Sequence, residues 1–339
     1  MTGKPVQVLD NVAIGGWGGG AFLAVSDNGT IIFIKRSDWP CRVFRMTDMN
    51  GRTIESRIAV SPSMLAKMGL SGVGTLNISP DGERAVFVNW KAGGTDLWML
   101  DSRIGEPQRF TIDPAEDEYP AWAPDGGAVA YTTNMPGAAC RISVKSAESG
   151  AAATPLRTWP RHFHVISWSH DGKWLAADDY HPTNKSDIVA LPLNGKEPVA
   201  VATGPANESG AQFSPDGRWI AYTSDESGRR EVWVVSFPEL ASRRQVSMGG
   251  GTNPQWDPKG HVLYYLQNGY LVSHEIRATE SLSLGRSQQL FPTPAIYMQS
   301  LPGGRFFLTE PNLQPRDTPI HLIVNWFEEL KRLLSAGNG

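Results

Sequence analysis

The sequence has few cysteines, no long apolar segment and no excess of basic residues, and each absence excludes a class of protein. Its two cysteines, Cys41 and Cys140, lack the spacing of zinc ligands or of a redox pair. No run of 18 or more apolar residues occurs and Met1–Pro5 lacks the apolar core of an export signal, so membrane insertion is not expected. The 31 basic and 34 acidic residues are scattered, which argues against nucleic-acid binding.

Glycine and proline are abundant, and a turn motif that contains them recurs along the chain. The copies are Ser79-Pro80-Asp81-Gly82, Ala123-Pro124-Asp125-Gly126, Ser169-His170-Asp171-Gly172, Ser214-Pro215-Asp216-Gly217 and Asp257-Pro258-Lys259-Gly260, with degenerate copies at Ser26-Asp27-Asn28-Gly29 and Leu301-Pro302-Gly303-Gly304. Successive final glycines are 43 to 46 residues apart after a first interval of 53. Such a period is typical of one propeller blade.

The motif has a local physical cause, and it predicts a hairpin at each copy. Proline presets φ early in a tight turn, aspartate bonds nearby backbone, and glycine adopts the positive φ that closes the hairpin. β-rich runs such as Trp219–Tyr222 and Glu231–Val235 follow the turns. We therefore predict an all-β propeller of four-stranded blades. Seven turn copies favour seven blades, and six blades is the alternative.

The ends of the chain suggest how the ring closes. The last blade, with Arg305–Leu308 and Ile320–Val324, has no outer strand of its own, and an N-terminal strand at residues 5–10 is predicted to complete it. Residues 326–335 have apolar side chains at helical spacing and predict a short C-terminal helix. The whole chain, 1–339, is thus predicted to be a single domain with blades over 11–325. The long first interval predicts an insertion within residues 58–74.

The turns and the strands after them resemble the TolB-like, or WD40-like, propeller repeats over about Pro5 to Leu334. The tail Val324–Leu330 further resembles the sensor propellers that follow a kinase and a membrane span in some bacterial receptor-type serine/threonine kinases. TolB itself is similar to a six-bladed ring, and the seven turn copies of this sequence depart from that number. A stand-alone protein is expected in the cytoplasm, and an excised receptor domain outside the inner membrane. A monomer is expected.

Functional residues are expected on the face opposite the repeated turns, where the loops differ from blade to blade. The candidates at the channel mouth are Trp39, Trp90, Glu118, Tyr119, Arg161, His162, His164, Asp179, His181, Glu208 and Asn253. His162 and His164 alternate along a strand, so both imidazoles would point the same way. No cofactor or metal is expected; these two histidines and Glu118 are only weak candidates for a metal site, and calcium is the alternative that the channel carboxylates and amides would suit.

Two functions of different classes follow from these residues. No nucleophile elbow, catalytic triad or metal-ligand motif is present, which favours a non-catalytic propeller that binds a protein, a peptide or a small ligand. The alternative is a metal-assisted hydrolase of the lactonase type that uses the channel. A third interpretation is the propeller half of a larger hydrolase.

Overall fold

The structure is a computed structural model, and it describes most of the chain between residues 42 and 311. The described residues are 14–15, 20–21, 23–25, 31–33, 42–55, 58, 73–91, 94–112, 115–135, 139–148, 150–182, 185–278, 282–311 and 321–323. The chain divides into two compact units, one formed by Met1–Cys41 with Asn312–Gly339 and the other by Arg42–Pro311. The second unit contains most of the candidate site residues.

The second unit consists of six antiparallel sheets, which we name blades 1 to 6 in chain order. Blade 1 comprises β6 (Val73–Ile78), β7 (Arg84–Lys91), β8 (Gly94–Asp101) and β9 (Pro107–Arg109). Blade 2 comprises β10 (Glu116–Trp122), β11 (Ala128–Asn134), β12 (Cys140–Ser146) and β13 (Ala153–Trp159). Blade 3 comprises β14 (Phe163–Trp168), β15 (Trp174–Tyr180), β16 (Ser186–Pro192) and β17 (Val199–Ala202).

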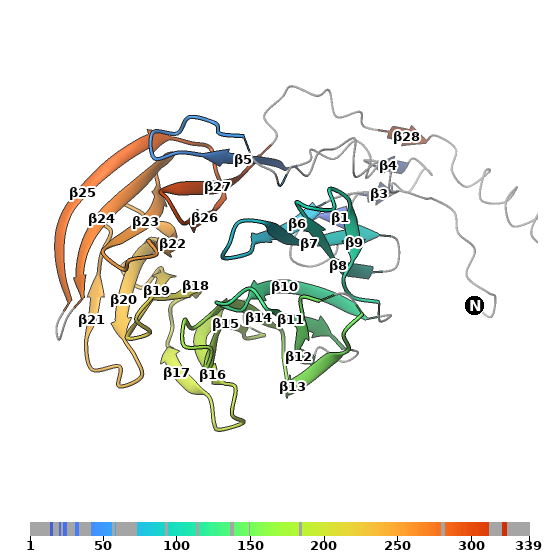
Figure 1. Ribbon diagram of the computed structural model, residues 1–339, viewed down its shortest axis with the longest axis horizontal. Coiled ribbons are helices and arrows are strands. Elements are labelled where there is room, and N and C mark those ends of the chain that lie inside the picture. Colours follow the sequence, from blue (N-terminus) through green and yellow to red (C-terminus); the bar gives the residue numbers. More distant parts are fainter. Residues whose placement is uncertain are drawn as a thin grey trace, which may run out of the picture. The chain divides into compact units, whose positions relative to one another are not determined.

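The remaining blades continue the same order, except that the last one borrows a strand. Blade 4 comprises β18 (Glu208–Phe213), β19 (Trp219–Ser224), β20 (Glu231–Ser236) and β21 (Arg243–Gln245). Blade 5 comprises β22 (Thr252–Trp256), β23 (Val262–Gln267), β24 (Tyr270–Ala278) and β25 (Leu282–Pro292). Blade 6 comprises β26 (Tyr297–Leu301), β27 (Arg305–Glu310) and β5 (Val43–Thr47). Figure 1 shows the blades following one another, with the first strands toward the centre and last strands such as β25 at the periphery.

The repeated turns join the first and second strands of the blades, as the sequence predicts. In each of the five main copies the last glycine donates its N–H to the carbonyl of the first residue, at 2.9 Å. These glycines have φ between 70° and 78°, a region that side chains with a Cβ rarely adopt. The motif is therefore a structural device that closes each hairpin.

Hydrophobic clusters fill all six junctions between neighbouring blades of the second unit. The cluster between blades 6 and 1, for example, joins Met46 and Phe307 to Leu76 and Phe87. Tryptophans take part in these clusters, as the sequence predicts: Trp122, Trp219 and Trp256 are at least nine-tenths buried.

Hydrogen bonds made by side chains also cross every junction of this ring. They are Asn77 Nδ2 to Pro120 O (2.6 Å), Val165 N to Thr132 Oγ1 (3.4 Å), Ser167 Oγ to Ala211 O (2.8 Å), Trp256 Nε1 to Gln212 O (3.2 Å), Met298 N to Asn253 Oδ1 (2.8 Å) and Ile78 N to Gln299 Oε1 (2.8 Å). The bond between Ile78 and Gln299 connects the first blade to the last, so six blades close the ring.

The predicted count of seven blades is wrong, and the six-blade alternative holds. The degenerate turn at 26–29 lies outside the described residues, but the strands that flank it, β3 (Leu23–Val25) and β4 (Ile31–Phe33), pair with each other in the first unit. The third strand of that sheet is β28 (His321–Ile323). The first unit also contains the pair β1 (Ile14–Gly15) and β2 (Gly20–Ala21). This turn copy therefore marks a hairpin that is not a blade of the ring.

The predicted pairing of residues 320–324 with the last blade is also wrong, because β28 pairs with β4. Instead β5 lies against β27 as the third strand of the last blade, with Arg45 opposite Leu308. A fourth strand is reduced to a bridge between Thr47 and Thr53. The strand predicted at 5–10, the insertion expected within 58–74 apart from Ile58 and residues 73–74, and the helix predicted at 326–335 lie outside the described residues.

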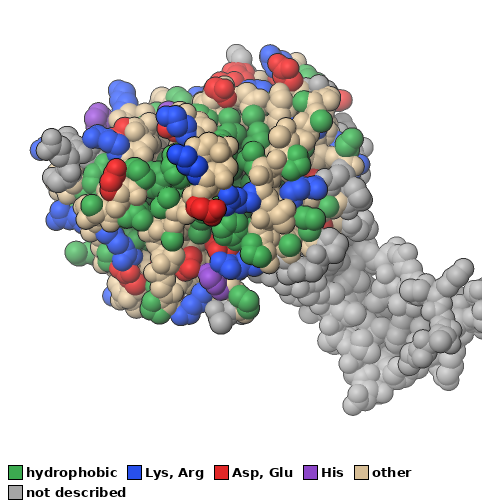
Figure 2. All heavy atoms as spheres, turned by 90° about the horizontal axis from the view of Figure 1, so that it is seen from below, with side chains coloured by type: hydrophobic (Ala, Val, Ile, Leu, Met, Phe, Trp, Pro, Cys, Tyr) green, Lys and Arg blue, Asp and Glu red, His purple; other side chains and the backbone are tan. Residues whose placement is uncertain are grey.

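The described part of the chain contains no helix that is long and apolar enough to cross a membrane. On the face shown in Figure 2, acidic and basic side chains are interspersed among hydrophobic ones. The described side chains of this face therefore form no continuous patch of one charge sign.

Candidate functional site

Four rings from blades 2 and 3 gather where these blades meet, and we call them the aromatic cluster: Tyr119, His162, His164 and Tyr180. Tyr119 belongs to β10, His162 precedes β14, His164 lies within it and Tyr180 ends β15. The two imidazole centroids are 4.6 Å apart, as their alternate positions predict. Tyr180 lies 4.3 Å from His164 and 5.8 Å from His162, measured between ring centroids.

Tyr119 is held in an unusual backbone conformation that directs its ring onto His164. Its φ is 53°, and the ladder of β10 with β11 shifts register between Glu118 and Ala121. A positive φ is a genuine outlier for a bulky residue, and such strain often occurs at binding sites. The ring stacks on His164 with the centroids 3.4 Å apart and the planes 15° apart.

Burial keeps the rings of the aromatic cluster uncharged at neutral pH. Burial, assisted by the neighbouring His162, lowers the pKa of His164 to about 2. Burial also lowers the pKa of His162, and it raises the pKa of both Tyr119 and Tyr180. The cluster therefore offers flat, neutral faces with polar edges, and His164 is too weak a base for proton transfer near pH 7.

Asp178, which the sequence did not single out, lies beside the aromatic cluster. It is 3% exposed and pairs with His164 across the ladder of β14 and β15. Its carboxylate accepts the N–H of Gly210 from blade 4, at 3.0 Å and 3.2 Å. Burial nevertheless raises the pKa of Asp178 to about 7. An acidic residue after the apolar run Leu175–Ala177 was the signal that could have revealed it.

Arg161 and Asp179 neutralise each other at the edge of this site. Arg161 Nε donates to Asp179 Oδ1 at 2.6 Å, and its NH2 group donates to Oδ2. The indole N–H of Trp159 donates to the same carboxylate at 2.8 Å. His181 similarly contacts Asp187, with 2.9 Å between Nε2 and Oδ2. These pairs are fixed in place, so they frame the aromatic cluster, in which Tyr119, His162 and Tyr180 are partly exposed and His164 is 1% exposed.

The other predicted residues are not gathered with the aromatic cluster, apart from Glu118. Glu118 adjoins Tyr119 and accepts a hydrogen bond from Asn134 at 3.2 Å, and burial raises its pKa. Asn253, with φ of 55°, uses its side chain to join blades 5 and 6.

Glu208 belongs to a separate pocket. Trp39 and the side chain of Trp90 lie outside the described residues.

The described part of the chain holds no group of three or more His, Cys, Asp or Glu side chains arranged to bind a metal ion. His162, His164 and Glu118, the weak metal candidates, are therefore not a ligand set.

The fold is a β-propeller, and solved TolB structures have a similar fold. The chain superposes on the putative TolB of Agrobacterium tumefaciens with a TM-score of 0.59 and 17% identity, covering 82% of this chain and 99% of that one. A prolyl endopeptidase structure matches with a TM-score of 0.52 and 15% identity, covering 89% of this chain and 50% of that one. The likeness concerns the fold, and the resemblance to kinase sensor propellers remains a prediction.

In sequence, 164 residues are 25% identical to the uncharacterized peptidase YuxL of Bacillus subtilis, which is 46% of this chain and 23% of that protein. The matched region thus spans about a quarter of that relative's length. No known protein-family description matches the chain.

Proposed function

We propose that the chain is a non-catalytic binding propeller that holds a peptide segment over the aromatic cluster. The observation that supports this most is the stacked pair of Tyr119 and His164, backed by Tyr180. Uncharged aromatic faces with polar edges bury apolar groups and accept or donate hydrogen bonds, which suits a peptide. A strained Tyr119 that is fixed before binding reduces the entropy lost on binding.

A peptide is the ligand that the similar proteins favour. YuxL is called a peptidase, and the present fold superposes on 50% of the chain of a prolyl endopeptidase. By analogy, the propeller half of a larger hydrolase would need to accept peptide segments too. The metal-assisted hydrolase alternative requires a ligand set in the channel, and a thermal-shift comparison of calcium, zinc and a chelator tests it. A stoichiometric metal that raises the melting temperature would favour that alternative.

Peptide binding is tested with a display library of random dodecapeptides selected on the full chain. We expect Tyr119→Ala to weaken the selected peptides by about tenfold, because it removes a stacking face worth about 1 kcal/mol or more. The matched control is Tyr270→Ala, which removes a tyrosine that is 37% exposed on blade 5. Equal affinity of the wild type and the Tyr119 variant for every selected peptide would refute the proposal.

A further inference from the structure

A second pocket, between blades 3 and 4, is lined by carboxylates. Its volume is about 300 Å³, and its lining residues are Thr203, Gly204, Pro205, Ala206, Glu208, Asp225 and Glu226. The segment from Thr203 to Ala206 links β17 to β18, and the two later acidic residues follow β19. Three of the seven lining residues are acidic and none is basic. The pocket therefore presents negative charge beside the small apolar wall of Pro205 and Ala206.

Glu208 is the deepest of these acids, and its hydrogen bonding is incomplete. The residue is 2% exposed. Its Oε1 accepts the hydroxyl of Ser224 at 3.1 Å, but its buried Oε2 accepts no hydrogen bond from the described residues. An unpaired buried carboxylate oxygen costs free energy, so a donor supplied by a ligand would be strongly favoured.

The other two acids, Asp225 and Glu226, differ in how far protein groups already neutralise their charge. Glu226 Oε2 forms an ion pair with Arg243 NH1 at 2.7 Å, which leaves little of its charge for a ligand. Asp225 Oδ1 accepts only the backbone N–H of Asn207, at 2.8 Å, among the contacts of the described residues. Glu208 and Asp225 are thus the two acids available to a cation.

Two cations border the pocket, and each already has a partner among its lining residues. Lys185 donates its ammonium to the carbonyl of Pro205, and Arg243 is engaged by Glu226 and by the Tyr222 hydroxyl. Burial raises the pKa of Glu208, with further contributions from Asp187 and Glu226, while the hydrogen bond from Ser224 opposes the rise. A positively charged ligand would lower the pKa of Glu208 again, because a charge of opposite sign favours the ionised carboxylate.

We propose that this pocket binds a lysine-type side chain, with the aliphatic stem along Pro205 and Ala206 and the primary ammonium donating to Glu208 Oε2 and Asp225. An ammonium has three donors on a flexible stem, which fits a pocket whose acceptors are few and separate. A divalent metal ion would need more converging oxygens, and the described residues hold no such group. The inference deepens the proposed peptide binding and rests on it for its biological context, since Glu208 would select a basic residue of the peptide.

The test uses a pair of small probes on the full chain. Nα-acetyl-lysine methylamide carries the ammonium, and Nα-acetyl-norleucine methylamide is its neutral counterpart. Ligand-observed NMR titration should show binding of the lysine probe at least about tenfold tighter than that of the norleucine probe, as expected for a charge-assisted hydrogen bond in a partly buried site. Equal binding of the two probes would overturn the proposal.

Charge-neutral variants locate the interaction. Glu208→Gln should weaken the lysine probe by about tenfold, whereas Glu239→Gln, an exposed acid of the same blade, should leave it unchanged. If the first variant does not fold, Asp225→Asn serves instead, because its amide oxygen can still accept the N–H of Asn207. Unchanged binding in the folded variant would refute the assignment, as would a calcium-induced rise in melting temperature, lost in Glu208→Gln, without any lysine-probe binding.

The outcomes for the two sites can be separated. Tyr119→Ala should leave the lysine probe unaffected, so loss of probe binding in this variant would move the cation site to the aromatic cluster and overturn the proposal. Retained probe binding in a protein that selects no dodecapeptide would refute only the proposed peptide function.

Discussion

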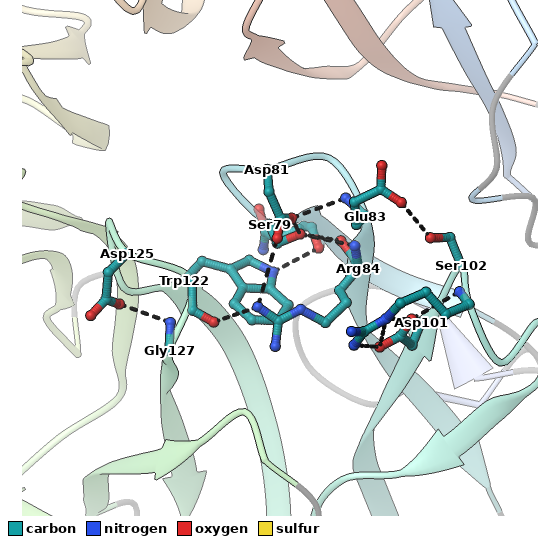
Figure 3. Close-up of polar contacts among 12 residues, drawn as sticks. Ser79, Asp81, Glu83, Arg84, Asp101, Ser102, Trp122, Asp125 and Gly127 are labelled. Carbon is teal, nitrogen blue, oxygen red and sulfur yellow. Dashed lines mark hydrogen bonds and ion pairs between the residues drawn. The ribbon is translucent and has the colours of Figure 1, made fainter.

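The guanidinium group of Arg84 lies over the indole ring of Trp122, 5.0 Å from its centroid, and so fastens blade 1 to blade 2. Its NH2 group also donates to the carbonyl of Gly126, at 2.7 Å, in the repeated turn of blade 2. Figure 3 shows Arg84 reaching from the turn of Ser79 and Asp81 toward that of Asp125 and Gly127. Trp122 in turn donates its indole N–H to Asn77 of blade 1 at 3.1 Å. Neighbouring blades are thus joined at the turns as well as through their cores.

Arg84→Ala should lower the free energy of unfolding by about 1–3 kcal/mol, since it removes a cation–π contact and a hydrogen bond at a half-buried junction. Arg84→Lys should recover part of this loss, because a lysine keeps the charge without the planar guanidinium. Urea denaturation measures both. Lys173→Ala, which breaks an exposed ion pair with Asp171 in the equivalent turn of blade 3, should cost less than about 0.5 kcal/mol. Equal losses for Arg84→Ala and Lys173→Ala would contradict the role of Arg84.

Asp178 should make stability depend on pH between about 4 and 7. An unfolded aspartate ionises near pH 3.9, whereas burial raises the pKa of Asp178 in the folded chain to about 7. The folded state therefore binds more protons over this range, and a contribution fully present below pH of about 4 is lost as the pH rises to about 7.

Asp178→Asn should accordingly become more stable relative to the wild type, by about 2–4 kcal/mol, between pH 4 and pH 8. Its amide oxygen can still accept the N–H of Gly210. Denaturation at several pH values measures the difference, with Asp216→Asn, in an exposed turn, as the control. A difference between Asp178→Asn and the wild type that does not change with pH would show that folding does not raise the pKa of Asp178.

Asn253 should be sensitive to the type of residue that replaces it. Asn253→Ala removes the hydrogen bond that Met298 N donates to Oδ1, and it places an alanine at a strained φ of 55°. We therefore expect this variant to lower the free energy of unfolding by about 2 kcal/mol. Asn253→Gly loses the hydrogen bond but adopts a positive φ without strain, so it should lose only about 1 kcal/mol. Thermal and urea denaturation of the pair separates the two effects. A glycine variant less stable than the alanine variant would contradict the strain argument.

The borrowed strand β5 should tolerate a charge on one face and not on the other. Met46 is 6% exposed within the cluster between blades 6 and 1, while Val43 in the same strand is 41% exposed. Met46→Asp should destabilise the fold by about 3 kcal/mol or more, because it buries an unpaired charge, and Val43→Asp should cost less than about 0.5 kcal/mol. Similar melting temperatures for the two variants would refute the placement of β5.

The sequence predicted those parts of the fold that depend on neighbours along the chain. The turn ending at Gly217 and the strand after it follow from proline, aspartate and glycine chemistry and from apolar patterning. Blade number did not follow, because a turn motif identifies a hairpin and not the sheet to which the hairpin belongs. The pairing of β5 with β27 could not be predicted for the same reason, because the residues of β5 carry no local signal for their partner strand.

In the candidate site too, the sequence predicted local features and missed those that depend on packing between blades. The alternate positions of His162 and His164 at the start of β14 were enough to predict that their rings lie together. The stacking of Tyr119 on His164 depends on how blade 2 packs against blade 3 and on a positive φ that the local sequence does not announce. The hydrogen bond that Asp178 accepts from Gly210 of blade 4 likewise depends on how neighbouring blades pack.

The pairing of β5 with β27 constrains the order in which the ring can be assembled during synthesis. Arg45 Nε bonds Glu310 Oε1 at 3.2 Å across a separation of 265 residues. When translation has released residues 43–47, the strand they must join has not yet been made, and contacts of such long sequence separation are slow to form. Blades 1 to 5 can pack in turn on the ribosome, whereas blade 6 must wait until almost the whole unit has emerged. Closure of the ring is then the last step of folding, and until it occurs the early strand and the late hairpin each present an unpaired edge to other chains.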